Sequence, residues 1–357
     1  MIFLLPLALI VAFVGYAPSK YGLRYNNHKY YILICGALIM ALSALRTPYT
    51  GTTDNYFYTV RYTMLQSYKS FQVYYDQMLS DYDFMSSEAG YYYTMWLLGK
   101  VFPSGQTSII VSSILITFAT CFFIRRNSAD VPLSLTIYIC LGLFTFNMNA
   151  MRQAMAMSIC LFAYEFAKER KLLPFILTVL LAMLYHKTAM CFFPVYFLPA
   201  LKNDLGSWAF YIFGLILCLL FIDRIIVGYY EISGENYSKT AAADGGGLFV
   251  IMLYLGTFVL AIYKQDIIEQ TKARTYLLAT LTGFVAYIAR FAGSHILERI
   301  SYYYFYFPVL LIPAIFQELD EREHRFIKLF FLIGAVALFA YRIWKGGFNN
   351  FTLYFLE

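Results

Sequence analysis

Long apolar runs alternate with short polar segments along almost the whole chain. The apolar runs are roughly 13–21 residues long, close to the ~20 residues with which an α-helix crosses ~30 Å of hydrocarbon. Strand alternation of the kind found in membrane barrels does not recur, so helices are the only way for these runs to span a bilayer. The pattern predicts twelve spans, at residues 2–18, 31–46, 107–124, 131–148, 151–167, 172–185, 188–200, 207–227, 247–263, 274–291, 300–316 and 326–343.

One further apolar segment, residues 90–102, is too short to span comfortably. Its Tyr-rich start is typical of a re-entrant or interfacial helix. The polar segments are no longer than loops, and the sequence shows no internal repeat. We therefore predict an all-α polytopic membrane protein with about twelve transmembrane helices. It forms one integral membrane domain over residues 1–357, with a large outer loop at 47–106 and a second outer loop at 228–246.

Composition supports this class and excludes others. Hydrophobic residues make up 61% of the 357 residues and charged residues 13%, whereas a soluble domain carries about 25% charged residues. The six Cys lie in apolar runs without a CxxC pair, which indicates small core residues rather than disulfides or metal ligands. Motifs for nucleotide hydrolysis and zinc proteolysis are absent from the sequence, and its basic runs are too short for a nucleic-acid surface.

The N-terminal apolar run has no basic residue ahead of it and is followed by Lys20 and Arg24, so we expect a retained span rather than a signal peptide. The positive-inside rule places short basic loops in the cytoplasm. With twelve spans, and with 90–102 not crossing, all the basic loops share that side. They are residues 19–30, 125–126, 168–171, 264–274 and 321–328.

The opposite, outer side holds the charged residues that topology does not explain. Intramembrane charge costs about 2.5–3.5 kcal/mol near the bilayer centre, so its retention favours a function. Arg152 and Gln153 fall in the first turn of a predicted helix that Asn147 or Asn149 can cap. The helix dipole disfavours an Arg there, unless an anion such as phosphate docks against the Arg and the free N–H groups together.

Two further outer places carry candidate chemistry. His186, beside Lys187 at the outer interface, is either a hydrogen-bonded core residue or a neutral imidazole that accepts a proton from a sugar hydroxyl. The second place lies at the ends of two spans and is followed by tyrosines, which form either an ordinary interfacial belt or a stacking surface for sugars beside a pyrophosphate clamp. Its members are Arg290, His295, Glu298, Arg299, Tyr302, Tyr303, Tyr304 and Tyr306.

The segment 47–106 adds acidic candidates. Arg46 and Asp54 are consistent with a snorkelling Arg and a solvated Asp. Asp81 and Asp83 have the D-x-D spacing of metal-dependent glycosyltransferases, but two acidic residues at that spacing are common by chance, and we predict no metal site. Glu88 precedes an aromatic run, where it can bind sugar hydroxyls, act as a base or favour a helix N-terminus.

The order of these motifs resembles the EpsG family. The matching stretches are Leu45-Arg46, Gly51 to Asp54, Tyr58, Glu88 to Tyr91, Met151 to Ala156, Arg170-Lys171, Leu181 to Ala189 and Arg299 to Tyr303, which together run from about 45 to 310. The block with Arg152, Gln153 and His186 is the most specific part. One departure is the spelling GTTD at 51–54, where the family often has GTD, and this leaves the orientation of Asp54 open.

The resemblance implies a fold of the GT-C type and a Wzy-type polymerase of O-antigen, capsule or exopolysaccharide. Such enzymes join repeat units carried on undecaprenyl pyrophosphate, outside the bacterial cytoplasmic membrane. An acceptor hydroxyl attacks the donor's anomeric carbon with inversion, and no cofactor or metal takes part. The implied partners are the two lipid-linked glycans and membrane lipids, together with a chain-length regulator and a flippase, and no nucleic acid.

The resemblance also implies roles for residues of this chain. The pyrophosphate clamp is Arg152 and Arg299, then Arg46 and Arg290; the base is His186 first, with Glu88 or Asp54 second; substrate contacts come from Gln153, Tyr302 and Tyr303. Two other functions stay open. One is a GT-C transferase that uses a polyprenyl-phosphate sugar, with a metal at Asp81 and Asp83, and the other is a transporter of lipid-linked glycans.

Overall fold

The structure is a computed structural model that describes residues 3–16, 28–50, 54–81, 88–221, 224, 227–228, 247–264, 266–292, 295–319, 321–345, 348 and 351–356. Apart from one isolated antiparallel bridge between Arg46 and Leu353, the described residues form helices and their connections. The prediction of an all-α protein is therefore confirmed for the described part of the chain.

The helices follow the apolar runs of the sequence closely. They are α1 (Leu4–Tyr16), α2 (His28–Ala44), α3 (Asp54–Leu65), α4 (Phe71–Asp81), α5 (Ala89–Gly99), α6 (Gln106–Asn127), α7 (Val131–Cys140), α8 (Leu143–Asn149), α9 (Met151–Lys168), α10 (Leu172–Tyr185), α11 (Leu205–Leu220), α13 (Gly247–Tyr263), α14 (Asp266–Glu269), α15 (Thr271–Ala289), α16 (His295–Tyr304), α17 (Tyr306–Gln317) and α18 (Glu321–Lys345), with 3-10 turns η3 (Lys187–Tyr196), η4 (Leu198–Ala200), η5 (Arg290–Ala292) and η7 (Tyr354–Leu356).

A multi-pass membrane protein is supported, although fewer helices have full spanning length than the twelve predicted. Within the described residues, three helices are long and apolar enough to cross a bilayer, namely Gln106–Asn127, Ile296–Gln317 and Arg325–Lys345. A fourth is obtained if α7 and α8, which are bent by 54°, form one broken span. Several of the other predicted spans are helices of 10–17 residues. The predicted span 188–200 differs in kind, because it consists of 3-10 turns with Pro194 and Pro199 in them.

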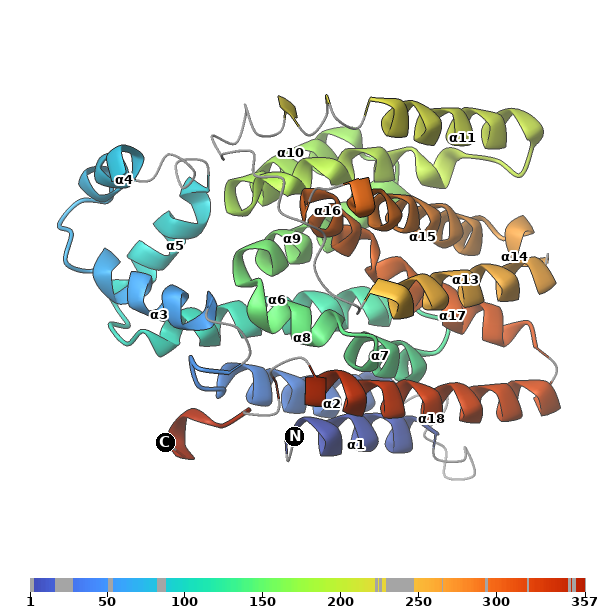
Figure 1. Cartoon of the computed structure of the whole chain (residues 1–357), viewed down its shortest axis with the longest axis horizontal. Coiled ribbons are helices and arrows are strands. Elements are labelled where there is room, and N and C mark those ends of the chain that lie inside the picture. Colours follow the sequence, from blue (N-terminus) through green and yellow to red (C-terminus); the bar gives the residue numbers. More distant parts are fainter. Residues whose placement is uncertain are drawn as a thin grey trace.

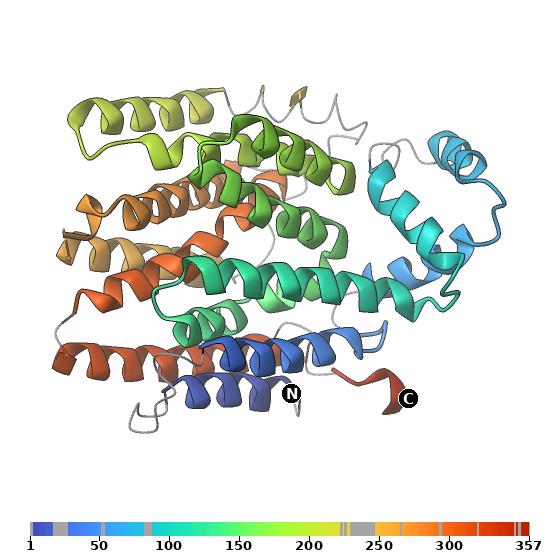
Figure 2. The ribbon, with the colours of Figure 1, turned by 180° about the vertical axis from the view of Figure 1, so that it is seen from behind.

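The long helices run nearly parallel, and the two ends of the molecule differ (Figure 1). The connections α6–α7 and α13–α15 and the start of α18 lie at one end, and Figure 2 shows the same arrangement from behind. These are places where the sequence has short basic loops. At the opposite end, α3, α4 and α5 form a lobe beside the start of α6. The segment 47–106 is thus not simply a loop, and the predicted interfacial segment 90–102 contains the 11-residue α5, too short to span.

The break between α7 and α8 has a local cause. Gly142 has φ 99°, a left-handed conformation that a residue with a Cβ adopts only at a cost of about 1–2 kcal/mol. The guanidinium of Arg342 from α18 lies directly over this glycine, where a Cβ would overlap it. Arg342 Nη1 donates a hydrogen bond of 2.6 Å to the Leu141 carbonyl, which the break has left without a helical partner.

We expect Gly142→Ala to lower the stability of the protein by about 2 kcal/mol or more, since it adds left-handed strain and displaces Arg342. The control is Gly334→Ala in α18, where an added Cβ meets nothing within 4 Å. The measurement is the thermal unfolding midpoint of both variants in detergent. Equal midpoints for Gly142→Ala and the wild type would show that the break does not need glycine.

Candidate functional site

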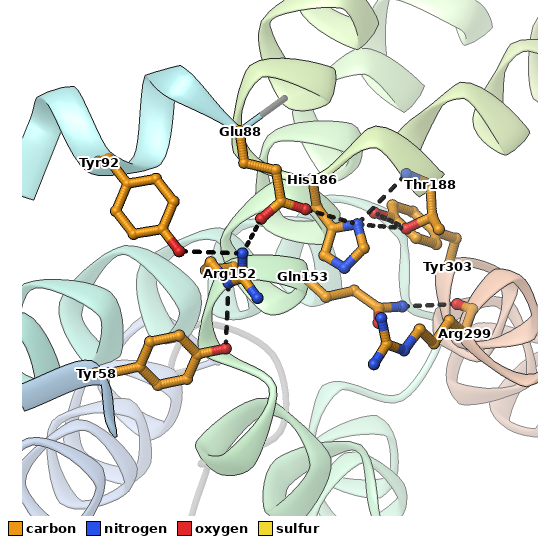
Figure 3. A network of polar contacts seen from close by, with 9 residues as sticks. All are labelled: Tyr58, Glu88, Tyr92, Arg152, Gln153, His186, Thr188, Arg299 and Tyr303. Carbon is orange, nitrogen blue, oxygen red and sulfur yellow. Dashed lines mark hydrogen bonds and ion pairs between the residues drawn. The ribbon is translucent and has the colours of Figure 1, made fainter. Parts of the chain in front are cut away.

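Three charged or titratable side chains from three separate elements meet where the lobe joins the helical body (Figure 3). Glu88 immediately precedes α5, Arg152 lies in the first turn of α9, and His186 follows the last residue of α10. The carboxylate of Glu88 does not cap its own helix, which leaves it available to the other two residues. All three are predicted as site residues from the sequence, and the structure brings them together.

Glycine explains how α5 comes so close to α10. A Cβ at Gly90 would lie 2.7 Å from the Cβ of Leu184 and 3.0 Å from the Leu184 carbonyl, so only glycine permits this contact. The Thr94 hydroxyl lies 2.9 Å from the Tyr185 hydroxyl one turn further on. This packing fixes Glu88 against the end of α10, next to His186.

An ion pair between Arg152 and Glu88 is the centre of the cluster. Arg152 Nη1 also donates to the Tyr92 hydroxyl at 3.3 Å, and its Nε donates to the Tyr58 hydroxyl at 3.5 Å. The side chains of Arg152 and Glu88 are only 20% and 6% exposed. Because little water screens them, the two charges interact strongly, and either one left alone would be costly to bury.

His186 is held through one ring nitrogen. Its Nδ1 lies 2.9 Å from the Thr188 hydroxyl, 3.4 Å from the Thr188 backbone nitrogen and 3.5 Å from Glu88 Oε1. The Thr188 hydroxyl in turn lies 3.1 Å from the hydroxyl of Tyr303 in α16, which is buried. The other nitrogen, Nε2, points toward Gln153 and Arg299 (Figure 3).

Arg299 completes the cluster from the side of α16. Gln153 Nε2 donates a 2.6 Å hydrogen bond to the Arg299 carbonyl and so ties the start of α9 to α16. The Arg299 side chain is exposed and is directed toward Gln153 and His186 (Figure 3). Its guanidinium makes no hydrogen bond or ion pair with any residue that the structure describes.

The surroundings shift the pKa values of His186 and Glu88 in opposite directions. Burial lowers the pKa of His186 well below its ordinary 6.5, and the positive charges of Arg299 and Arg152 lower it further, so the imidazole is neutral at neutral pH. Burial raises the pKa of the Glu88 carboxyl, an effect that Arg152, Arg299 and Lys187 oppose.

The structure does not bring Arg46 into this cluster. Its side chain is 1% exposed and lies among neutral oxygen atoms at the end of α2. It donates to the carbonyls of Ser43 and Met148 and to side-chain oxygens of Ser113 and Asn55, the contact with Met148 being 2.7 Å. These bonds join α2, α3, α6 and α8 at the base of the lobe.

Four other predicted residues have different surroundings. Arg290 is buried, pairs with Glu298 at 3.0 Å and lies 4.2 Å over the Tyr287 ring. Tyr302 stacks on Phe146 with ring centroids 3.6 Å apart, whereas Tyr303 reaches His186 through Thr188. Asp54 begins α3 and is exposed, outside the contacts of the cluster.

Several residues of the site were not singled out by their chemistry in the sequence. They are Tyr58, Arg61, Tyr92 and Thr188. The contacts of the first three with the cluster need the lobe to fold over α9, whereas Thr188 contacts His186 from the turn that follows α10. Local signals existed for three of them, since Tyr58 and Arg61 are one helical turn apart and Thr188 is two residues from His186. Among the described residues, no three His, Cys, Asp or Glu side chains are grouped as a metal site requires; Asp83 and the side chain of Asp81 lie outside this description.

These observations define a multi-pass helical membrane protein in which arginines surround a buried carboxylate and imidazole, at the end opposite its basic loops. Comparison with known families matches residues 29–356 to the EpsG family, and the chain therefore belongs to that family. The resemblance seen in the motifs is thus confirmed, and it indicates a membrane protein of exopolysaccharide biosynthesis. Neither the curated proteins nor the solved structures compared with this chain include a match.

We expect His186 to make the stability of the protein depend on pH. The pKa of His186 in the native state lies below 6.5. As pH falls through 6.5, His186 therefore binds a proton in the unfolded chain but stays neutral in the native state. The free energy of unfolding is therefore unaffected by the titration of His186 above about pH 6.5. Below that pH it falls by at most about 1.4 kcal/mol over the first pH unit. The loss of thermal stability in detergent between about pH 7.5 and 5.5 should be smaller in His186→Gln than in the wild type. Identical pH dependence in the two proteins would contradict this assignment.

Proposed function

We propose that this protein is a polysaccharide polymerase that joins undecaprenyl-pyrophosphate-linked oligosaccharide repeat units on the outer face of the bacterial cytoplasmic membrane. Its membership of the EpsG family supports a role in exopolysaccharide biosynthesis. The observation that carries the proposal is the Arg152–Glu88 ion pair beside His186 and the guanidinium of Arg299. A reaction that needs both anion stabilisation and a proton acceptor at one place fits this arrangement.

In the proposed step, a hydroxyl oxygen of the acceptor sugar forms a bond to the anomeric carbon of the donor. The bond from that carbon to the pyrophosphate oxygen breaks, and undecaprenyl pyrophosphate leaves with the electron pair. The hydroxyl proton passes to a base of the protein. This single displacement inverts the anomeric configuration, and negative charge grows on the leaving group as the bond breaks, where fixed guanidiniums stabilise it.

Arg152 and Arg299 are the residues best placed to be those guanidiniums. Arg152 lies at the N-terminus of α9, whose free N–H groups also favour an anion. Within the part of the chain that the structure describes, Glu88 is the only carboxylate that either guanidinium contacts. The surroundings of Arg46 and Arg290 support structural roles for them instead, because both are buried among oxygen acceptors or paired with Glu298.

His186 is the base that the geometry favours. In the structure the Thr188 backbone N–H donates to Nδ1, which places the proton of the neutral ring on Nε2. The proposed base uses the other tautomer, in which Nδ1 carries the proton beside Glu88 Oε1 and Nε2 presents its lone pair on the side of Gln153 and Arg299. The lowered pKa keeps the imidazole unprotonated at neutral pH, the state in which a base must begin. Thr188 and Tyr303 position the ring, and Glu88 acts through it rather than on the sugar.

Arg152→Gln should abolish polymer formation while the protein stays in the membrane. Loss of one preorganised donor to a developing anion lowers the rate by about 100- to 1,000-fold. The control is Arg126→Gln, which breaks an Arg–Glu pair of 3.2 Å at the end with the basic loops and should leave the rate unchanged. The measurement is polymer length produced from purified lipid-linked repeat units, with the amount of protein in the membrane fraction recorded. Wild-type chain length in Arg152→Gln would remove the clamp from the proposal.

A GT-C transferase that uses a polyprenyl-phosphate sugar and a metal at Asp81 and Asp83 is the second candidate. It differs from the polymerase in needing a divalent ion. We expect polymerisation by the purified protein to continue in EDTA, because the proposed step uses only guanidiniums and imidazole. Activity that disappears in EDTA and returns with a divalent ion would favour the second candidate. A transporter of lipid-linked glycans would move the repeat units without joining them, so polymer formed by purified protein in detergent distinguishes it from both enzymes.

A further inference from the structure

A third arginine reaches the cluster besides Arg152 and Arg299. It comes from the lobe, and the contacts above do not explain it. Arg61 of α3 donates a hydrogen bond of 3.2 Å from Nη1 to the Tyr92 hydroxyl. The same oxygen accepts the 3.3 Å hydrogen bond from Arg152 Nη1. A tyrosine oxygen has two lone pairs, so it can accept both. Both guanidiniums therefore contact the same neutral hydroxyl, and their Nη1 atoms are at most about two hydrogen-bond lengths apart.

The charges at this place are unbalanced. Arg61 has no ion pair with any carboxylate that the structure describes, and Glu88 is the partner of Arg152. Like charges this close repel, and the partial burial of both side chains weakens the screening by water. An arrangement of this kind is stable when a further anion joins the two cations.

Unused hydrogen-bond donors point to the same conclusion. The hydroxyls of Tyr74 and Tyr91 are buried and find no hydrogen-bond partner among the described residues. Tyr74 is 4% exposed, and its ring centroid lies 6.2 Å from that of Tyr92, whose hydroxyl accepts from both arginines. A buried polar group without a partner is uncommon in a native protein and calls for a bound water, ion or ligand. Two such hydroxyls beside two guanidiniums provide hydrogen-bond donors suited to phosphate oxygens.

We infer that Arg61, Arg152 and the Tyr74 hydroxyl form a phosphate subsite for the lipid-side phosphate of the pyrophosphate carrier. The inference rests on the proposed function. It adds Arg61 as a residue that gives the site a preference for pyrophosphate over monophosphate. Arg299 and His186 lie on the far side of Arg152 from Tyr92 (Figure 3), so the sugar-linked phosphate belongs between Arg152 and Arg299. The second phosphate then falls between Arg152 and Arg61, where its oxygens replace the Tyr92 hydroxyl as acceptor.

The test compares two probes that differ by one phosphate, farnesyl pyrophosphate and farnesyl monophosphate, bound to the full-length protein in detergent at fixed ionic strength. Arg61→Gln should weaken pyrophosphate binding by about tenfold and leave monophosphate binding unchanged, since it removes the cation of one subsite only. Arg61→Lys keeps the charge and should restore most of the preference for pyrophosphate. Tyr92→Phe should not weaken pyrophosphate binding, because the phosphate takes the place of that hydroxyl.

Lys100→Gln is the matched control, because Lys100 belongs to the same lobe but contacts the Tyr68 carbonyl and the Trp96 ring. It should change neither affinity. Pyrophosphate affinity in Arg61→Gln equal to that of the wild type, or an equal loss for both probes, would overturn the subsite. Arg152→Gln separates this failure from that of the proposed function, since it should weaken both probes. If Arg152→Gln binds both probes normally, the clamp itself is wrong, whatever Arg61 does.

Discussion

The ion pair between Glu88 and Arg152 is the interaction on which the arrangement of this protein depends. It connects the lobe formed by α3, α4 and α5 to the first turn of α9, and it places a carboxylate beside His186. Both side chains are largely shielded from water, so removing either would leave an uncompensated charge in a poorly screened place. In the proposed site an anion that binds Arg152 joins Glu88 around the same guanidinium, which links occupation of the site to the electrostatics of the neighbouring base. The pair therefore serves both as a structural joint and as the position that a phosphate is proposed to enter.

The arginines that the sequence predicted for the clamp show how different surroundings give one residue type different roles. Arg46 satisfies carbonyl and hydroxyl oxygens from four helices and is sealed from solvent. Arg290 has its own carboxylate and aromatic neighbours. Arg299, in contrast, presents a guanidinium without a partner among the described residues to the side of His186. An arginine that is already satisfied has little affinity left for a ligand, because binding would have to replace hydrogen bonds of similar strength.

Tight backbone contacts place these side chains, and two glycines allow them. Gly90 lets α5 approach α10 closely enough for Glu88 to face His186. Gly142 breaks the helix ahead of α9, so α8 and α9 can turn back into the body while Arg342 satisfies a carbonyl at the break. Both glycines precede α9 in the chain, Gly90 in the lobe and Gly142 at the break before α8.

The lengths of the apolar runs in the sequence by themselves determined the all-helical class, the multi-pass character and the positions of most helices. Bilayer thickness and backbone hydrogen bonding leave few alternatives for such runs. The order of motifs also identified the EpsG family and the residues Glu88, Arg152, His186 and Arg299. Tertiary structure alone decided which arginines share a site, that Thr188 and Tyr303 hold the imidazole, and that Arg61 approaches Arg152 through Tyr92. The physical reason is that burial and partners depend on contacts between residues such as Tyr58 and Arg152, which lie far apart along the chain, whereas helix periodicity is local.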